Sequence, residues 1–405
     1  MKFLLALFVS TLGVAGSAIA QNKWVATWAT SPQPDTDETV LKAEELSAGT
    51  MRQIVHLSVG GARLRLRLSN RYGTEPLHVT AVHLAKAVAP GSPKILPGSD
   101  KAVLFSGRAD VVIPAGADYI SDPVEFNAPP LSDLAITLQV DATSRKLTGH
   151  PGSRATSFLA TGDALSADDP TDAKRITRWY FIAGVDVEAS VDAFTIVVLG
   201  DSITDGHGAT TDGNDRWPDL FAKRLQANAA TKKIGVVNQG IGGNRVLLDG
   251  IAANALARFD HDVLSQPSIK WVIVLEGIND LGMLTHEKEV SDEEHSAEVR
   301  RIESAYEQIV VRAHAQGIKV IGGTLTPYVG SAFYHPNMKN EADRQALNDW
   351  IRKHFDAVID FDKVVRDPEH PEKLRAEFDC GDHLHPSPAG FTAMAEAIPV
   401  LLFAN

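Results

Sequence analysis

The sequence contains very little cysteine and, after its first twenty residues, no long hydrophobic run. Its one cysteine, Cys380, cannot form a disulfide within the chain, so we expect packed cores rather than cross-links to stabilise the fold. No later apolar stretch has the roughly 20 residues that a membrane helix needs, and stable membrane insertion is not expected. Basic blocks are also lacking, and the formal net charge is −12, which argues against nucleic acid as a partner.

The first twenty residues are different, because they have the pattern of a secretory signal peptide. Lys2 supplies a positive start, Phe3 to Gly16 is almost continuously apolar, and Ala18-Ile19-Ala20 has the small residues of a cleavage site. We therefore expect residues 1–20 to be removed and the mature protein to be soluble and secreted or periplasmic. The length of 405 residues, with 44% hydrophobic and 22% charged residues, is enough for two globular domains.

Residues 24–187 have a period of two. In Ala62–Leu68 leucine alternates with arginine, which places the leucines on the core face of a strand. Turn clusters separate such runs, and no helical period interrupts them. We predict an all-β, jelly-roll-like sandwich over residues 21–189, with a surface loop at Thr161–Lys174 before its last strand. The other expected strands are Gln53–Val59, Leu77–Leu84, Ala109–Ile113, Leu134–Val140 and Tyr180–Val187.

From Phe194 onward the pattern changes, and short apolar runs alternate with stretches of helical period. Buried strands separated by helices are typical of a parallel sheet with crossover connections. We predict a three-layer α/β sandwich over residues 190–405. Its expected strands are Phe194–Leu199, Ile234–Val237, Trp271–Leu275, Val320–Gly322 and Val358–Phe361, and its expected helices include Pro218–Leu225, Val299–Ala313 and Ala342–His354.

The loops of this domain carry the candidate chemistry, since ligands of an open α/β sheet bind beyond the carboxyl ends of its strands. A serine hydroxyl becomes a nucleophile when a histidine takes its proton and an acid orients that histidine. Glycine-turn N–H groups and a side-chain amide stabilise the resulting oxyanion. Ser202, His385 and Asp382 are the candidates for nucleophile, base and acid. Gly243 and Asn279 are the candidate oxyanion donors.

These loops, in this order, resemble the sequence blocks of the SGNH (GDSL) hydrolase superfamily. Gly200-Asp201-Ser202 is similar to the nucleophile block, and Gly243 to the glycine of the second block. Gly277-Ile278-Asn279-Asp280 is similar to the G-x-N-D block, and Asp382-His383-Leu384-His385 to the final D-x-x-H block. The resemblance covers about Phe194 to Leu402.

The resemblance implies a flavodoxin-like SGNH fold and a serine ester hydrolase without cofactor or metal. It also implies that Ser202 contributes its backbone N–H to the oxyanion hole beside Gly243 and Asn279, and that Asp382 orients the base His385. The two-domain layout resembles a secreted esterase subgroup. The family's short name expects leucine at Ile203, a departure that is common in the family.

Several features of the sequence allow alternatives to this interpretation. His383 competes with His385 for the role of base, and only the D-x-x-H spacing favours His385. An α/β-hydrolase elbow would need Gly-x-Ser-x-Gly, which Thr204 interrupts. The pair His383-x-His385 lacks the partner motif of a zinc site. The acidic residues between Asp201 and Asp215 lack a calcium-loop spacing, so a solvated loop is expected there, and Cys380 is expected to be a packed small residue.

The sequence leaves the substrate open. The leading hypothesis is removal of a short acyl group, acetyl above all, from a carbohydrate, so that the partner is a small-molecule or polysaccharide ester. A lipase or lysophospholipase acting on longer acyl chains is the first alternative, and a non-catalytic glycan-binding protein is the second. Residues 327–340 could form a lid in which Tyr334 sets substrate preference. The β-sandwich is expected to be a passive extension more than a glycan-binding module, and no oligomeric state is predicted.

Overall fold

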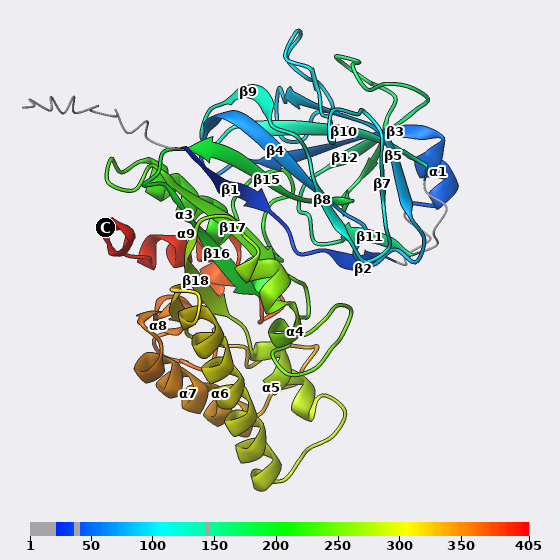
Figure 1. Ribbon diagram of the computed structural model, residues 1–405. Helices are drawn as coiled ribbons and strands as arrows, with labels where there is room; N and C mark the ends of the chain where they lie inside the picture. Colours follow the sequence, from blue (N-terminus) through cyan, green and yellow to red (C-terminus); the bar gives the residue numbers. More distant parts are fainter. Residues whose placement is uncertain (1–21, 36–40, 142–145, 405) are drawn as a thin grey trace, which may run out of the picture.

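The computed structural model describes residues 22–35, 41–141 and 146–404 and divides them into a β-rich N-terminal domain and an α/β C-terminal domain (Figure 1). The predicted fold class is confirmed in both halves. The expected signal peptide, residues 1–20, lies outside the described residues. The division expected at residue 190 falls between the strand that ends at Ala189 and the strand that begins at Phe194. No helix in the described parts of the chain is long and apolar enough to cross a bilayer.

The N-terminal domain consists of antiparallel sheets packed face to face. One sheet has the order β1-β15-β4-β8, with β9 also paired to β4, the second has the order β13-β12-β3-β10-β5-β6, with β7 paired to β5, and a small third sheet has the order β14-β11-β2. Its elements are β1 (Lys23–Ala29), β2 (Gln33–Asp35), α1 (Ala43–Ser47), β3 (Gly49–His56), β4 (Gly61–Ser69), β5 (Leu77–Lys86), β6 (Lys101–Ala102), β7 (Val111–Ile113), β8 (Asp118–Ile120), β9 (Val124–Ala128), β10 (Asp133–Asp141), β11 (Leu147–His150), β12 (Ser157–Thr161), β13 (Lys174–Ile176), β14 (Trp179–Tyr180) and β15 (Ile182–Ala189).

The alternation in β4 explains how this domain is layered. Leu64, Leu66 and Leu68 are fully buried in the sandwich core, as the period of two predicts. On the opposite face Arg65 Nε lies 2.7 Å from an Asp186 carboxylate oxygen on β15. Arg67, also on that face, is buried instead, because its guanidinium donates to Ser265 of the C-terminal domain. The second domain therefore covers part of the outer face of the sandwich.

Two expectations for the N-terminal domain are corrected. The short helix α1 interrupts the strands, where none was expected. The segment Thr161–Lys174 leads into β13 at Lys174 and is followed by three strands rather than one. Both features are short and lack a regular apolar period, so sequence patterning alone gives them no signal.

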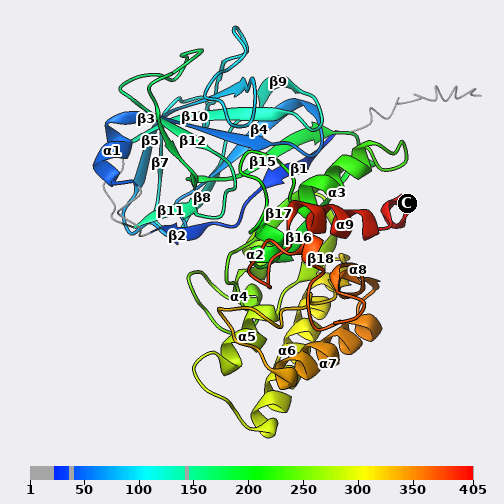
Figure 2. The ribbon, with the colours of Figure 1, turned by 180° about the vertical axis from the view of Figure 1, so that it is seen from behind.

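The C-terminal domain has a parallel five-stranded sheet of order β17-β16-β18-β19-β20. Helices α3, α8 and α9 cover one face, and α4, α5, α6 and α7 cover the other (Figures 1 and 2). The elements are β16 (Phe194–Gly200), α2 (Ser202–Asp205), α3 (Trp217–Gln226), β17 (Ile234–Gly240), α4 (Ala255–Phe259), the π-helical turn η1 (Asp260–Leu264), β18 (Ile269–Leu275), α5 (Ile278–Thr285), α6 (Asp292–His314), β19 (Lys319–Gly323), α7 (Met338–His354), β20 (Ala357–Ile359), α8 (Phe361–Val365), the 3₁₀ turns η2 (Ala376–Phe378) and η3 (Val400–Phe403), and α9 (Pro388–Ala397).

The last strand is shorter than its apolar pattern suggests. The expected strand Val358–Phe361 ends at Ile359, because Asp360 caps a new helix. Its carboxylate accepts the Lys363 N–H at 3.2 Å. Phe361 is therefore the first residue of α8, where it is fully buried in the core and packs on Trp217 with ring centroids 5.2 Å apart.

Candidate active site

Ser202 lies at the carboxyl end of the central strand β16 and opens the short helix α2. Asp201 caps this helix by accepting the Ile203 N–H at 2.9 Å. Gly200 permits the tight strand-to-helix turn, because a Cβ there would lie 2.1 Å from Thr204 Oγ1. Ser202 keeps only 8% of its surface exposed. The nucleophile candidate is thus held on a short, capped turn at the sheet edge.

Ser202, His385 and Asp382 form a continuous hydrogen-bonded relay. The Ser202 hydroxyl lies 2.8 Å from His385 Nε2, and His385 Nδ1 lies 2.6 Å from an Asp382 carboxylate oxygen. The other Asp382 oxygen accepts the backbone N–H of His385 at 2.9 Å. Burial raises the pKa of Asp382, but the hydrogen bonds from the side chain and backbone of His385 outweigh it and hold that pKa well below its ordinary value. The acid therefore stays ionised beside the base.

His383 does not contact the nucleophile. Its side chain is exposed, and its Nδ1 lies 2.6 Å from an Asp379 carboxylate oxygen. His385 is largely buried, with 8% of its surface exposed, and its ring nitrogens face Ser202 and Asp382. Of the two histidines, only His385 is therefore in position to accept the Ser202 proton.

The candidate oxyanion donors Gly243 and Asn279 follow β17 and β18, the two strands that pair with β16. Gly243 lies in a turn with a φ of 69°, a left-handed conformation that favours glycine. The turn is held to the next loop by Asp280, whose carboxylate accepts the N–H groups of Val246 at 2.8 Å and Leu247 at 3.0 Å. Burial raises the pKa of Asp280 to about 6. These two hydrogen bonds therefore join the loop after β17, which contains Gly243, to α5, which contains Asn279.

Asn279 has its amide oriented by two contacts. The Tyr334 hydroxyl donates to Asn279 Oδ1 at 2.5 Å, and Asn279 Nδ2 donates to the Asn244 carbonyl at 2.7 Å. An amide nitrogen has two N–H groups, so one remains to face an oxyanion. Because Tyr334 occupies the oxygen, the amide cannot flip without losing a buried hydrogen bond. Tyr334 is thus a positioning residue for the side-chain donor.

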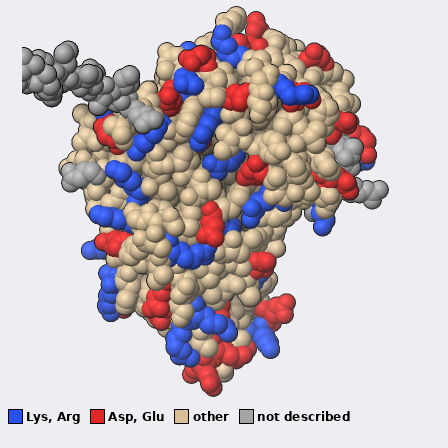
Figure 3. All heavy atoms as spheres, in the orientation of Figure 1, with Lys and Arg blue, Asp and Glu red and all other residues tan. Residues whose placement is uncertain are grey.

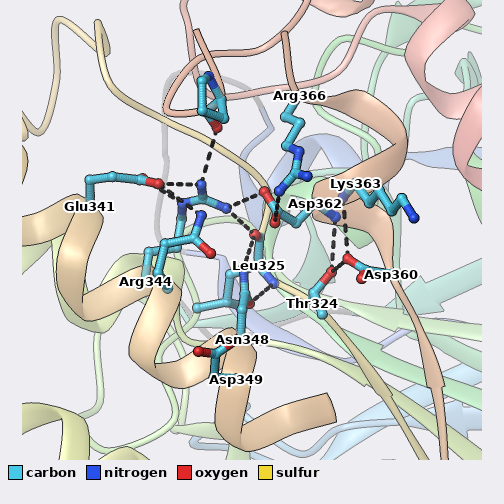
Figure 4. Close-up of polar contacts among 12 residues, drawn as sticks. Thr324, Leu325, Glu341, Arg344, Asn348, Asp349, Asp360, Asp362, Lys363 and Arg366 are labelled. Atoms are coloured by element: carbon cyan, nitrogen blue, oxygen red, sulfur yellow. Dashed lines mark hydrogen bonds and ion pairs between the residues drawn. The ribbon is translucent and has the colours of Figure 1, made fainter. Parts of the chain in front are cut away.

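The sequence allows residues 327–340 to form a lid that contains Tyr334, but the structure places Tyr334 in the core. Tyr328 and Tyr334 are buried in the core of the domain, and only Phe333 of the three aromatic residues is exposed. The chain that leads into this segment is anchored at Leu325. Asn348 contacts both backbone polar groups of Leu325, and buried Arg344 donates to its carbonyl at 2.7 Å (Figure 4). Tyr334 therefore belongs to the floor of the site.

A buried arginine, Arg258, ties together the carboxyl ends of three strands. Its guanidinium donates to the carbonyl of Gly200 at 3.0 Å and to that of Gln239 at 2.7 Å. It also pairs with Glu276 at 3.0 Å and with Asp262 at 2.9 Å. No motif in the sequence pointed to this residue. Its role depends on contacts between loops that are far apart along the chain.

Two buried acids, Asp201 and Glu276, directly follow the neighbouring strands β16 and β18. Burial raises the pKa of Asp201 to about 7, and the neighbouring charges of Asp280 and Asp205 add to this rise. Burial and the charge of Asp201 raise the pKa of Glu276 well above its ordinary value. One carboxylate oxygen of each has no hydrogen-bond partner among the described residues. The fold therefore favours protons on this pair.

The acidic segment Asp201–Asp215 is not the solvated loop that the sequence predicts. Asp205 is buried, and one of its carboxylate oxygens lies 2.8 Å from Nε2 of His150, a buried residue of the N-terminal domain. Asp212 accepts the backbone N–H of Thr156 at 2.6 Å and its hydroxyl at 2.7 Å. The β-sandwich thus contacts the loop that carries the nucleophile. The sequence contained no signal for this contact.

Two sets of potential metal ligands contain members of the relay. His207, Asp382 and His385 offer ligand atoms within 4.8 Å of one another, as do Asp379, Cys380 and Asp382. In the first set, however, both His385 nitrogens already contact Ser202 and Asp382. Cys380 is an exposed residue and not the packed one that was expected. Partial burial of its thiol and the charge of Asp382 raise the pKa of Cys380 to about 11. A thiol of this kind is a poor ligand and a poor nucleophile.

Comparison with known proteins finds a family model that matches most of the C-terminal domain. Residues 198–393 match the model of the GDSL-like lipase/acylhydrolase family, and this span contains all five candidate site residues. A solved GDSL-like lipase from Bacteroides thetaiotaomicron is 19% identical, with 50% of this chain and 84% of that chain covered and a TM-score of 0.37. A solved catalytic mutant of an acetylxylan esterase from Geobacillus stearothermophilus is 22% identical, with 50% and 91% covered and a TM-score of 0.38. No curated protein matches the chain.

Proposed function

We propose that this chain is a carboxylic-ester hydrolase that removes short acyl groups, acetyl above all, from carbohydrates. Its residues 198–393 match the model of the GDSL-like lipase/acylhydrolase family. The observation that carries the proposal is the relay from Ser202 through His385 to Asp382, with separations of 2.8 Å and 2.6 Å. A relay of this geometry activates a serine for acyl transfer.

The proposed reaction has two halves. His385 Nε2 accepts the Ser202 proton while Oγ attacks the ester carbonyl, and the N–H groups of Ser202, Gly243 and Asn279 stabilise the oxyanion. Protonated His385 then donates to the departing sugar alcohol, which leaves an acyl group on Ser202. Water, deprotonated by His385, attacks this acyl-enzyme, and the acid and free serine are released. Asp382 stabilises the imidazolium in both halves.

The surroundings of the serine support a small acyl group. Ser202 and His385 each keep only 8% of their surface exposed. Buried Tyr334 and Asn279 fill the floor, and the segment that contains Tyr334 packs into the core instead of forming an apolar flap. The neighbouring side chains of His207 and Asp382 are polar and partly exposed, which suits a hydroxyl-rich leaving group.

One observation favours longer acyl chains as the second candidate. Leu248 and Ile251 follow Gly243 along the chain and are 59% and 68% exposed. Exposed apolar side chains on a site-forming loop can bind the alkyl chain of a lipid ester. A series of p-nitrophenyl esters from acetyl to palmitoyl separates the two candidates. We expect kcat/KM to be highest for acetyl, and a maximum at long chains would favour the lipid substrate.

The test of the proposal uses acetylated polysaccharides as substrates. Wild-type protein is expected to release acetate and to react with a fluorophosphonate probe, and Ser202→Ala is expected to lose both activities. Ser296→Ala, on the exposed side of α6, is the matched control and should retain both. Polysaccharide binding without acetate release or probe labelling would instead support the non-catalytic glycan-binding alternative.

The proposal includes export of the protein, for which the signal-like residues 1–20 are the support. Expression in a bacterial host with an export pathway should give a mature chain that begins at Gln21. N-terminal sequencing of the purified protein measures this directly. Retention of Met1 in an intracellular product would contradict it.

A further inference from the structure

One loop of the β-sandwich, residues 150–156 between β11 and β12, extends to the catalytic centre. His150 contacts Asp205 at 2.8 Å, and Thr156 contacts both carboxylate oxygens of Asp212. The backbone of Arg154 is held between these contacts, because its carbonyl accepts the Asp212 N–H at 2.9 Å. The loop is therefore fixed to the segment that follows Ser202.

Arg154 contacts His207, whose ring packs against the catalytic base His385. Its Nη2 donates to His207 Nδ1 at 3.2 Å, and the His207 ring packs against the His385 ring with centroids 4.0 Å apart. His207 Nε2 lies 3.7 Å from an Asp382 carboxylate oxygen. Burial, the charge of His385 and the charge of Arg154 lower the pKa of His207, which keeps Nδ1 available as an acceptor. These contacts place a guanidinium at the edge of the relay.

The guanidinium has donors to spare. Within the described parts of the chain, Arg154 forms no ion pair, its side chain has a hydrogen bond only to His207, and its Nε is buried without a hydrogen-bond partner. By contrast, the buried arginines Arg216, Arg258 and Arg344 all pair with carboxylates. A partly buried cation without a counter-ion is costly unless an anion completes its hydrogen bonds.

The backbone conformation also presents this side chain. Arg154 has a φ of 47°, which lies in the left-handed region that residues with a Cβ seldom adopt. Strain of this kind persists where surrounding contacts enforce it, and here the Asp212 contacts do so. Arginine is suited to anion recognition, because its planar fork matches the two oxygens of a carboxylate.

We propose that Arg154 binds the carboxylate of an acidic sugar residue close to the acylated one, so that the enzyme prefers acylated glycans that contain uronic acids. This inference rests on the proposed function and names its substrate class. It also gives the β-sandwich a direct role in specificity, in place of the passive role that was expected. In a chain with a formal net charge of −12, such a cation offsets the general repulsion of acidic substrates.

The test compares two substrates that differ only in the anionic group. One is an acetylated oligosaccharide that contains glucuronic acid, and the other is the same compound with that carboxyl group reduced to an alcohol. We expect wild type to deacetylate the acidic form with a kcat/KM about 10- to 100-fold higher, the range expected for a charged hydrogen bond. The ratio should collapse towards one in Arg154→Gln, be intermediate in Arg154→Lys and fall as salt concentration rises. Arg108→Gln, on the exposed surface of the same domain, should keep the wild-type ratio.

Other outcomes would overturn the proposal. Equal losses on both substrates in Arg154→Gln would mean that Arg154 acts only through His207, and a wild-type ratio near one would remove the preference itself. An effect of Arg154→Gln on anionic phospholipids but not on acidic glycans would assign the anion to a lipid headgroup.

Binding to Ser202→Ala separates this proposal from the proposed function. Isothermal titration with the unacetylated acidic oligosaccharide and its reduced form should show Arg154-dependent binding of the acidic form only. If wild type cleaves p-nitrophenyl acetate but neither glycan, the proposed function fails. In that case, Arg154-dependent binding of the acidic form would still support the proposal for Arg154, and equal binding of both forms would contradict it.

Discussion

At the scale of single residues, the oxyanion site depends on one phenol. Tyr334 holds the Asn279 amide in the orientation that leaves an N–H free, and it does so from the buried floor of the site. Burial raises the pKa of the Tyr334 hydroxyl, so it remains a proton donor at any pH at which the enzyme would act. The orientation of Asn279 is therefore independent of pH.

Tyr334→Phe is expected to lower kcat about tenfold or more with little change in KM, because a single oxyanion donor contributes on the order of 10²- to 10³-fold to turnover. Steady-state kinetics on p-nitrophenyl acetate measures the split between kcat and KM. Tyr328→Phe is the matched control, since Tyr328 is buried in the same segment but does not contact Asn279. A change in KM alone would contradict the positioning role.

Asp201 gives a prediction for the dependence of stability on pH. Its pKa is about 7 in the folded protein, against an ordinary value of 3.8, so folding favours its protonated form. This contribution to stability is complete below about pH 4 and is lost as the pH rises through about 7. Asp201→Asn keeps an oxygen for the Ile203 N–H but carries no charge. The melting temperature of Asp201→Asn minus that of wild type should therefore be larger at about pH 8.5 than at about pH 5. Calorimetry at both values tests this, and a constant difference would disprove it.

At the scale of elements, the carboxyl ends of β16, β17 and β18 are joined by one side chain. Arg258 donates to carbonyls near the ends of β16 and β17 and pairs with Glu276, which follows β18. It also donates to the side chain of Asn244 at 2.9 Å. The loops with the oxyanion donors begin at these points. A shared donor fixes their relative positions more precisely than the sheet alone.

Arg258→Leu is expected to lower the free energy of unfolding by about 3–5 kcal/mol, because it removes one charged partner of buried Asp262 and the donor to the buried carbonyls of Gly200 and Gln239. Turnover should also fall, since the loops lose their common donor. Urea unfolding and kinetics measure the two effects. Arg108→Leu is the control, because Arg108 and its partner Asp110 have side chains that are 74% and 45% exposed, and it should change stability by about 1 kcal/mol or less. Equal effects of the two substitutions would refute the role of Arg258.

At the scale of the whole molecule, the two domains share buried polar contacts. The Ala26 N–H donates to Thr195 Oγ1 at 3.0 Å, and the Val236 N–H donates to Ser58 Oγ at 2.9 Å. Ser31 donates to Gln239 at 2.6 Å within the Arg258 cluster. These individual hydrogen bonds specify how the two domains pack. On the face drawn in Figure 3, basic and acidic side chains are interspersed over both domains, so no block of one charge covers this face.

His150→Leu tests how strongly this interface supports the nucleophile loop. It leaves buried Asp205 without its partner, so we expect the free energy of unfolding to fall by about 3–5 kcal/mol. Adding Asp205→Asn should recover part of the loss, because it removes the uncompensated charge. A double-mutant cycle from urea unfolding gives the coupling between the two residues. Strictly additive effects would show that the pair is not coupled.

The fold classes and the candidates for chemistry can be predicted from the amino-acid sequence alone. Alternation with a period of two identifies β4, and continuous apolar runs identify β16 and β18, because each pattern follows directly from which faces of a strand are buried. The blocks around Ser202, Gly243, Asn279 and His385 were also readable, since each follows a strand or has a characteristic spacing. These are local properties of the chain.

The contacts that hold those residues in place are visible only in the folded molecule. Arg258, His150 and Tyr334 act through contacts with segments far away in the chain, and no local pattern encodes such distances. Tyr334 was noticed as part of a lid, but its burial makes it a support for Asn279. The same reason applies to Arg154, which reaches the relay from another domain. Sequence periodicity reports which face of an element is buried, whereas the partner across an interface depends on how the domains pack.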